Sequence, residues 1–339
     1  MKESCSKRIC HLLEIKSSSP CPKHIKRLFL ILAAVVLALT QGCSGDQEIT
    51  LVDFSKTVAV ERQETPSPDH NHLRVAVAAM ISPKETFVYY RQLLDYIGRN
   101  LDQEIQLIQR KTYGEINELL AKGKIDLAFI CSGPYVTGKG RDGFELLATP
   151  QVQGSHFYRA YLIVNKDGPL HKLEDLRGRV FAFTDPDSNT GKLVPTYWLA
   201  QKGERPASFF GKTIYTYSHD NSILAVSRGL VDGASVDGLI WEYYNYKNPT
   251  LTSRTRIIKK SQPYGIPPLV ASAYLPSKQR ERIQDLLFSM HLDPKGQKIL
   301  EELMISRFET PREEWYEPIR QMKKTLALLD RRSYAPEKP

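Results

Sequence analysis

From residue 73 onwards, short apolar runs alternate with segments of helical periodicity, and this alternation constrains the fold more than any other feature of the sequence. Residues 73–80, 104–109 and 126–131 have the length and composition of strands. Between them, residues 84–101 and 113–122 place apolar side chains at helical spacing. Strands that alternate with helices predict a parallel sheet covered by helices, and hence an α/β fold.

A second unit with the same alternation occupies residues 173–258. Its expected strands are 180–183, 213–217 and 233–236, and its helices are expected to start near Gly191, Asn221 and Leu239. Two extended runs, 161–165 and 268–272, bracket this unit. The chain is therefore expected to cross twice between two lobes.

This pattern predicts a two-lobed clamshell with two crossover strands. Residues 278–331 have the pattern of helices that return to the first lobe. Lobe 1 is expected to combine residues 72–164 with 265–332, and lobe 2 to comprise residues 165–264. In sheets of this kind, ligands bind beyond the carboxyl ends of the strands. Three loops follow such ends and are expected to face one cleft: 81–83, 132–135 and 185–190.

The third of these loops carries three short hydrogen-bonding side chains, Ser188, Asn189 and Thr190, between a strand and a helix. The first turn of a helix has unpaired backbone N–H groups and a positive dipole end, so it favours an anion. In isolation, Ser188 or Thr190 reads as an ordinary helix N-cap. The convergence of the three loops favours an oxyanion site, and the two roles are compatible. A nucleotide P-loop is excluded, because Pro186 and Leu193 replace its required residues.

The N-terminus has the pattern of a secretion signal. Residues 28–39 form an uninterrupted apolar run that follows basic residues and is too short to span a bilayer comfortably. The run leads to Gly42-Cys43, which resembles a bacterial lipobox, so Cys43 is the expected lipidation site. We expect a lipoprotein signal peptide at 1–42 and a flexible tether at 43–71. The alternative is a plain secretory signal with an incidental cysteine.

Charge and cysteine content exclude several function classes. Residues 1–42 carry +5 of the formal net charge of +9, so the remainder is only mildly basic. No basic-aromatic recognition motif is present, and nucleic acid is not an expected partner. The five cysteines fit no zinc spacing, and the mature chain would retain Cys43 and Cys131. We expect no disulfide framework, no metal site and no cofactor.

Several motifs occur in the order found in one known family. They are Ser82-Pro83, Asp126–Phe129, Ser132–Tyr135, Leu173–Gly178, Asp185–Gly191, Ser218–Asp220 and Val231–Asp237. In this respect residues 73–320 resemble PhnD-like substrate-binding proteins of phosphate, phosphite and phosphonate ABC transporters. The resemblance implies a type II periplasmic-binding-protein fold that closes on an oxyanion.

The resemblance also implies roles for individual residues. The hydroxyl-rich turn at Ser188–Thr190 would bind phosphoryl oxygens, with Asn189 where family members commonly carry threonine. Ser132 and Tyr135 match the loop of the first lobe, and His219 matches the histidine of the second lobe. Phosphonate binders of the family hold a ligand's amino group with acids, one of them near Asp237. A second acid is absent here, since Ile266-Pro267-Pro268 occupies its place, and this disfavours an aminophosphonate.

Chemistry alone also suggests roles for the same side chains. Ser218-His219-Asp220 cannot form a catalytic triad, because adjacent residues cannot surround one another. His219 could bind an oxyanion as imidazolium or as a neutral N–H donor, or it could be a structural residue beside a helix cap at Asp220. Asp237 could accept a hydrogen bond from a protonated ligand oxygen, or be a solvated loop acid. Tyr89 and Tyr135 are expected to line the cleft.

The leading hypothesis is a binding protein, not an enzyme. It would be a lipid-anchored, monomeric protein of the periplasm or cell envelope that captures a phosphorus oxyanion and delivers it to an ABC permease. A second hypothesis is a sensory protein that reports the same ligand to a membrane histidine kinase or receptor. A third, a hydrolase that uses His219 and Asp237, has no supporting nucleophile or metal motif.

Overall fold

The computed structural model describes residues 72–333, all of which belong to one compact unit. The expected signal peptide at 1–42, the lipidation site Cys43 and the tether at 43–71 lie outside the described residues. Within residues 72–333, no helix combines the length and apolar character needed to cross a membrane.

The first sheet has six strands in the order β13-β4-β12-β3-β1-β2. Its strands are β1 (His72–Val77), β2 (Glu104–Ile108), β3 (Leu127–Phe129), β4 (Glu145–Gln151), β12 (Leu269–Ala271) and β13 (Arg307–Glu309). β1 pairs in parallel with β2 and β3, whereas β12 is antiparallel to β3 and β4. β4 and β13 were not predicted, and they extend the expected parallel core at one edge.

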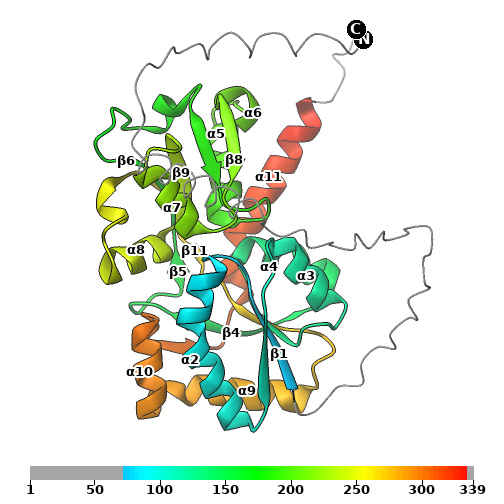
Figure 1. Cartoon of the computed structure of the whole chain (residues 1–339). Coiled ribbons are helices and arrows are strands. Elements are labelled where there is room, and N and C mark those ends of the chain that lie inside the picture. The colour runs from blue at the N-terminus through cyan, green and yellow to red at the C-terminus, as the bar shows by residue number, and fades with distance from the viewer. Residues whose placement is uncertain (1–71, 334–339) are drawn as a thin grey trace, which may run out of the picture. The chain divides into compact units, whose positions relative to one another are not determined.

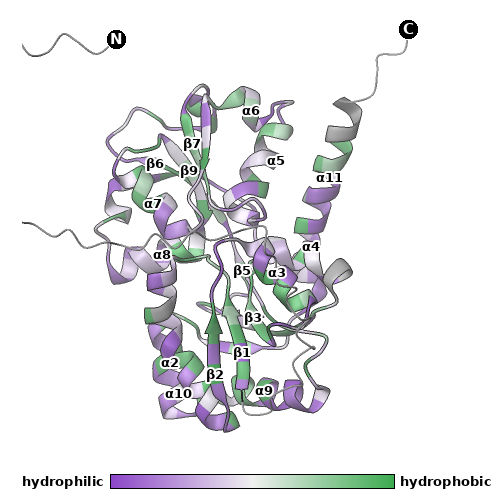
Figure 2. Ribbon diagram, turned by 45° about the vertical axis from the view of Figure 1, so that its right-hand side comes forward, coloured by the Kyte–Doolittle hydropathy of each residue, from purple (hydrophilic) through white to green (hydrophobic). Residues whose placement is uncertain are grey.

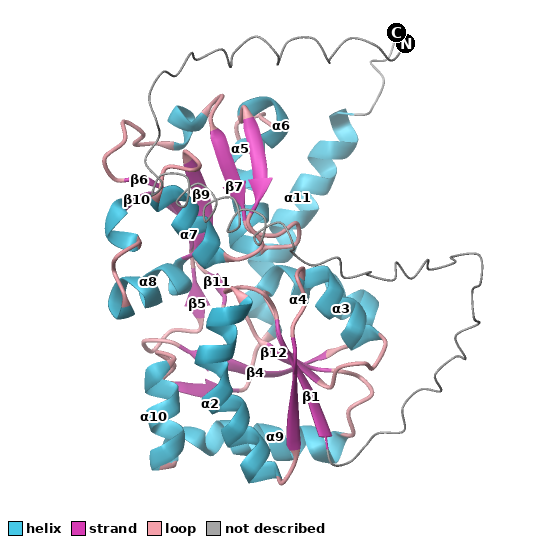
Figure 3. Ribbon diagram, in the orientation of Figure 1, coloured by secondary structure: helices cyan, strands magenta, loops and turns pink. Residues whose placement is uncertain are grey.

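Both faces of this sheet are buried, which explains the continuous apolar runs in its strands. On β1, Leu73 and Val75 pack into one core cluster, while Ala76 packs into another on the opposite face. The helices α2 (Pro83–Leu101), α9 (Ser277–Ser289) and α10 (Pro294–Glu302) cover the first face, and α3 (Tyr113–Ala121) and α4 (Ser132–Asp142) cover the second. Figure 3 shows α4 above β1 and α3 to its upper right, with α2 and α10 to its left.

The second sheet has five strands in the order β10-β6-β9-β7-β8. They are β6 (Ala160–Asn165), β7 (Val180–Phe183), β8 (Lys212–Tyr215), β9 (Gly233–Asp237) and β10 (Thr255–Lys260). α5 (Val194–Ala200) and α6 (Pro206–Phe209) pack against one face, and α7 (His219–Ser227) and α8 (Gly238–Lys247) against the other. Four short turns of 3₁₀ helix complete the description: η1 (Leu173–Leu176), η3 (Thr252–Arg254), η4 (Met290–Leu292) and η5 (Glu313–Tyr316).

Two short strands lie between the sheets, β5 (Phe157–Tyr158) and β11 (Tyr264–Gly265), and they pair antiparallel (Figure 1). The second crossing contains β11, and the boundary of 264/265 stays a prediction. The first crossing comes earlier than the expected boundary of 164/165, because β6 is hydrogen-bonded to β9 and β10 in the second sheet.

The last helix, α11 (Glu317–Ser333), contacts both halves of the unit. It packs against α4 beside the first sheet and against α5 beside the second. Ile319 and Met322 of α11 join the same buried cluster as Phe181 and Trp198. Figure 2 shows hydrophobic and hydrophilic residues in turn along α11, as expected for a helix with one buried face. The sequence predicted that the C-terminal helices return to the first lobe. α11 instead contacts both lobes.

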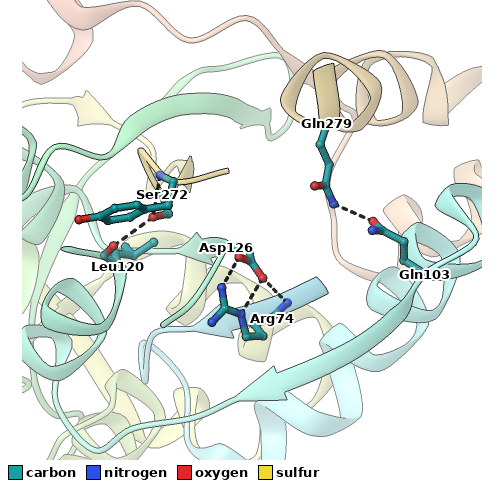
Figure 4. A network of polar contacts seen from close by, with 7 residues as sticks. Arg74, Gln103, Leu120, Asp126, Ser272 and Gln279 are labelled. Atoms are coloured by element: carbon teal, nitrogen blue, oxygen red, sulfur yellow. Dashed lines mark hydrogen bonds and ion pairs between the residues drawn. The ribbon is translucent and has the colours of Figure 1, made fainter. Parts of the chain in front are cut away.

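A polar network lies at the amino ends of β1 and β3 (Figure 4). Asp126 accepts hydrogen bonds from the backbone N–H of Arg74 at 2.7 Å and from its guanidinium at 2.6 and 3.0 Å. This pairing raises the pKa of Arg74. Nearby, Ser272 donates its hydroxyl to the carbonyl oxygen of Leu120 at 3.1 Å, which ties β12 to α3. The pair of Arg74 and Asp126 is charge-assisted and planar, which makes it strong and also specific in its geometry.

Candidate functional site

The candidate site lies where strands of both sheets end and helices begin. From the first sheet, β1 leads into α2 and β3 leads into α4. From the second, β7 leads into a π-helical turn, η2 (Asn189–Leu193), β8 leads into α7, and β9 leads into α8. Several helix N-termini therefore converge, and each brings unpaired N–H groups and the positive end of its dipole.

Direct hydrogen bonds join the two lobes around this site. The backbone N–H of Tyr113 donates to Asp185 Oδ2 at 3.1 Å, and that of Ser82 donates to Asp220 Oδ1 at 2.9 Å. The backbone N–H of His219 donates to the carbonyl oxygen of Met80 at 2.9 Å. All three bonds connect a residue of one lobe with a residue of the other, so the described conformation is closed.

Ser188 is a helix N-cap, as predicted from its position between a strand and a helix. Its Oγ accepts a hydrogen bond from the backbone N–H of Gly191 at 3.0 Å. Gly191 is packed tightly, because a Cβ at this position would lie 2.4 Å from Thr184 Oγ1. Ser235 of β9 donates its hydroxyl to the carbonyl oxygen of Thr190 at 2.6 Å. The π-helical turn is therefore held against the second sheet, and α5 starts later than the expected Gly191.

Asn189 and Ser132 meet through a tyrosine that the sequence analysis did not identify. Tyr158 Oη accepts a hydrogen bond from Asn189 Nδ2 at 3.1 Å and lies 2.5 Å from Ser132 Oγ. Tyr158 belongs to β5, which lies between the two sheets. The series of contacts from Asn189 through Tyr158 to Ser132 therefore links the two lobes where the chain crosses between them. All three side chains are buried.

The position of the proton on His219 follows from its neighbours. Its Nδ1 lies 3.1 Å from the backbone N–H of Asp237 and 3.1 Å from Thr184 Oγ1. A backbone amide can only donate, so Nδ1 is the acceptor and the proton is on Nε2. Burial lowers the pKa of His219 to about 3. The sequence left open whether His219 is an imidazolium or a neutral N–H donor. The geometry indicates the neutral form.

Asp237 is a buried helix cap rather than a solvated loop acid. Its Oδ1 accepts hydrogen bonds from the backbone N–H groups of Leu239 at 2.8 Å and Ile240 at 3.4 Å. Burial raises the pKa of Asp237 to about 7. Burial also raises the pKa of Asp185 to about 6. The alternative of a helix cap at Asp220 is wrong, because Ser218 caps α7 and Asp220 accepts a hydrogen bond from the other lobe.

Some buried side-chain atoms of the site have no hydrogen-bond partner in the described part of the chain. They are Tyr113 Oη, Asn189 Oδ1, Thr190 Oγ1 and His219 Nε2. Buried polar atoms are nearly always paired in folded proteins, so an unpaired group of this kind requires an explanation. Three of the four are on residues that the sequence singled out as oxyanion ligands.

Two predicted residues lie away from this group. Tyr135 points to the C-terminal segment, where its Oη donates to Glu313 Oε1 at 2.5 Å and its ring lies 4.6 Å from that of Tyr316. The structure therefore does not bring Tyr135 to the site. Tyr89 lies further along the interface between the lobes, where its ring meets Tyr243 of α8 edge to face at 5.1 Å.

Tyr113, Tyr158, Thr184 and Ser235 are site residues that sequence reasoning missed. Tyr113 had a detectable signal, because Thr112 and Glu115 form a capping box at a helix that follows a strand end. Tyr158 had none, since its place depends on the crossing of the chain. Among residues 72–333, no group of three or more His, Cys, Asp or Glu side chains is arranged to hold a metal ion.

Comparison with known proteins agrees with this geometry. The profile of a family described as "ABC transporter, phosphonate, periplasmic substrate-binding protein" matches residues 75–316. The chain belongs to this family. The phosphonates-binding periplasmic protein of Escherichia coli strain K12 is 28% identical over 234 residues, which cover 68% of this chain and 69% of that protein.

Solved structures support the fold of this phosphonate-binding family. A binding protein component of an ABC phosphonate transporter from Pseudomonas aeruginosa superposes with a TM-score of 0.74 at 24% identity, covering 79% of this chain and 90% of that one. PhnD1 from Prochlorococcus marinus, in complex with methylphosphonate, gives a TM-score of 0.69 at 20% identity, covering 76% and 99%. The predicted two-lobed type II periplasmic-binding-protein fold is confirmed.

The titration of Asp237 makes a testable difference to stability in this family member. Between pH 4 and 7 the folded state retains a proton on Asp237 that the unfolded chain has lost, because burial raises its pKa from 3.8 to about 7. The folded state is therefore destabilised as the pH rises through this window. Asp237→Asn retains a side-chain oxygen for the cap and does not titrate.

We predict that Asp237→Asn gains stability relative to the unsubstituted protein as the pH rises from 4 to 7, by up to about 4 kcal/mol. Urea unfolding of the two ligand-free proteins at each pH measures this difference. Asp185 is present in both proteins, so its own contribution cancels. A difference that stays constant from pH 4 to 8 would contradict the assignment.

Proposed function

We propose that this protein captures a phosphorus oxyanion, namely phosphate, phosphite or a phosphonate, between its two lobes and delivers it to an ABC permease. The observation that carries the proposal is the group of buried, unpartnered polar atoms on Tyr113, Asn189, Thr190 and His219. They lie at converging helix N-termini, where an anion is favoured. An oxyanion at this position would provide the missing partners.

Neutral donors would hold the anion. His219 donates from Nε2 without carrying charge, and Thr190 and Tyr113 offer hydroxyl groups. In a site closed off from water, preorganised dipoles interact with a charge more strongly than they do in solution. The hydrogen bonds from Ser235 to Thr190 and from the Asp237 amide to His219 would hold these two residues in place before the ligand arrives. Little reorganisation is then required on binding.

The site also offers an acceptor, and this favours a ligand that carries a proton. Asn189 gives its Nδ2 to Tyr158 and leaves its Oδ1 without a partner. A monoprotonated phosphate, phosphite or phosphonate can donate to that oxygen, whereas sulfate at neutral pH cannot. A buried acceptor that faces another acceptor costs about 1–3 kcal/mol.

Titration calorimetry at pH 7 with phosphate, phosphite, methylphosphonate and sulfate tests this function. We expect at least one phosphorus compound to bind, and sulfate to bind at least about tenfold more weakly. Asn189→Thr should reduce this discrimination, since a hydroxyl can donate to sulfate, and the exposed Asn248→Thr should leave it unchanged. If no phosphorus compound binds at millimolar concentration, the proposed function is wrong.

Closure of the lobes can be tested at Gly133 of α4. A Cβ at Gly133 would lie 2.4 Å from the carbonyl oxygen of Asp187 and 2.9 Å from the amide nitrogen of Asn189, both on the other lobe. Gly133→Ala should therefore hold the lobes apart and weaken methylphosphonate binding about 100-fold, or about 2.7 kcal/mol. Gly168→Ala is the control, because the nearest atom there is 3.5 Å away. Equal affinities for the two variants would contradict a closed binding state.

We further propose that Cys43 anchors the protein through a lipid, which would place the binding unit close to its permease. The support is the apolar run that ends in Gly42-Cys43. In a bacterial host, the unsubstituted protein should fractionate with membranes and incorporate labelled palmitate. Cys43→Ala should do neither, and labelling that persists in this variant would exclude Cys43 as the anchor.

A further inference from the structure

An apolar cavity of about 170 Å³ adjoins the candidate oxyanion site. Both lobes contribute to its walls. Tyr89 and Tyr90 of α2 and Phe129 and Phe308 of the first sheet come from one lobe, and Ile240 and Tyr243 of α8 come from the other. Tyr89 and Tyr243 meet edge to face across the interface of the lobes. The cavity is therefore assembled only when the lobes are closed.

Asp237 joins the cavity to the polar site. It is one of the residues that line the cavity, and its backbone N–H donates to Nδ1 of His219. Met80 and Ile240 also belong to both, since each lines the cavity and packs in the cluster around Tyr113. A ligand bound at the polar site would thus have the cavity beside it.

The walls of the cavity suit an uncharged group. No Lys, Arg or His side chain lines it, and Ile266 and Pro267 contribute apolar surface. Two acids are present, but both have partners: Asp237 caps α8, and Glu242 Oε1 accepts a hydrogen bond from Tyr161 Oη at 3.0 Å. An ammonium group would have to compete with those bonds, whereas an apolar group would bury surface without such a cost.

The size of the cavity sets the size of the group. An enclosed apolar cavity of about 150 Å³ accommodates a benzene molecule. A phosphate or methylphosphonate ligand would leave nearly all of this surface without contacts, and such gaps forfeit dispersion energy. The volume fits a phenyl ring or a short branched alkyl chain.

We propose that the preferred ligands are phosphonates with an uncharged apolar substituent of up to about the size of a phenyl ring, held in this cavity while the phosphonate group occupies the polar site. This inference rests on the proposed function and specifies its ligand class. Each buried methylene adds about fourfold to affinity, so a substituent of several carbons is expected to dominate the selectivity.

Calorimetry of the unsubstituted protein at pH 7 with phosphate, methylphosphonate, 2-aminoethylphosphonate and phenylphosphonate tests the inference. We expect phenylphosphonate to bind at least tenfold more tightly than methylphosphonate, and 2-aminoethylphosphonate to bind no more tightly than methylphosphonate. The inference is overturned if phenylphosphonate is equal to or weaker than methylphosphonate, or if 2-aminoethylphosphonate binds most tightly, and in either case the proposed function stands. If none of the four binds, the proposed function fails and the inference fails with it.

A variant of the cavity wall provides a second readout. Ile240 is half-buried at the start of α8, and Ile240→Asn places a polar group in the cavity. The ratio of phenylphosphonate to methylphosphonate affinity should fall at least fivefold in this variant. Tyr246→Asn, on the exposed surface of the same helix, should leave the ratio unchanged. An unchanged ratio in Ile240→Asn would show that the phenyl ring lies elsewhere.

Discussion

The hydrogen bond from the backbone amide of Asp237 to Nδ1 of His219 determines the chemistry of the site. It fixes the tautomer of a fully buried imidazole and leaves Nε2–H as a donor without a partner in the described structure. An imidazolium would place a second N–H against the amide of Asp237, and burial disfavours its charge as well. The site therefore presents oriented dipoles rather than a cation. This arrangement suits a protein that must release its ligand, since a buried charge pair would make release slow.

The acids around the site bond to backbone amides, and two of these bonds form across the lobes. Asp185 accepts from the amide of Tyr113 and Asp220 from that of Ser82. Each places a carboxylate where a helix N-terminus of the other lobe would favour an anion. Closure thus satisfies carboxylates and amides together. The pairing of β5 with β11 and the span of α11 across both halves limit how the lobes can move relative to each other.

Much of the architecture was predictable from the sequence because strands buried on both faces leave continuous apolar runs. The run at 180–183 is β7 as predicted, and its phenylalanines fill the core. β4 and β13 were missed for local reasons: β4 contains Pro150, and β13 has only three residues. The position of the first crossing depends on which sheet β6 joins, and its own sequence does not specify that.

The sequence predicted some residues of the candidate site, but not the charge states or the contacts of those residues. The loop at Ser188–Thr190 and the pair His219 and Asp237 stand out because they follow strand ends. The direction of Tyr135 could not be predicted, since it is set by Glu313, far along the chain. The most direct test is ¹⁵N NMR of histidine-labelled protein, with His219 assigned by His219→Gln, before and after addition of the best-bound phosphorus oxyanion. The account predicts a neutral ring with its proton on Nε2 from pH 5 to 8, and a downfield shift of that proton on binding. A protonated Nδ1, or an Nε2–H resonance that the ligand does not move, would contradict it.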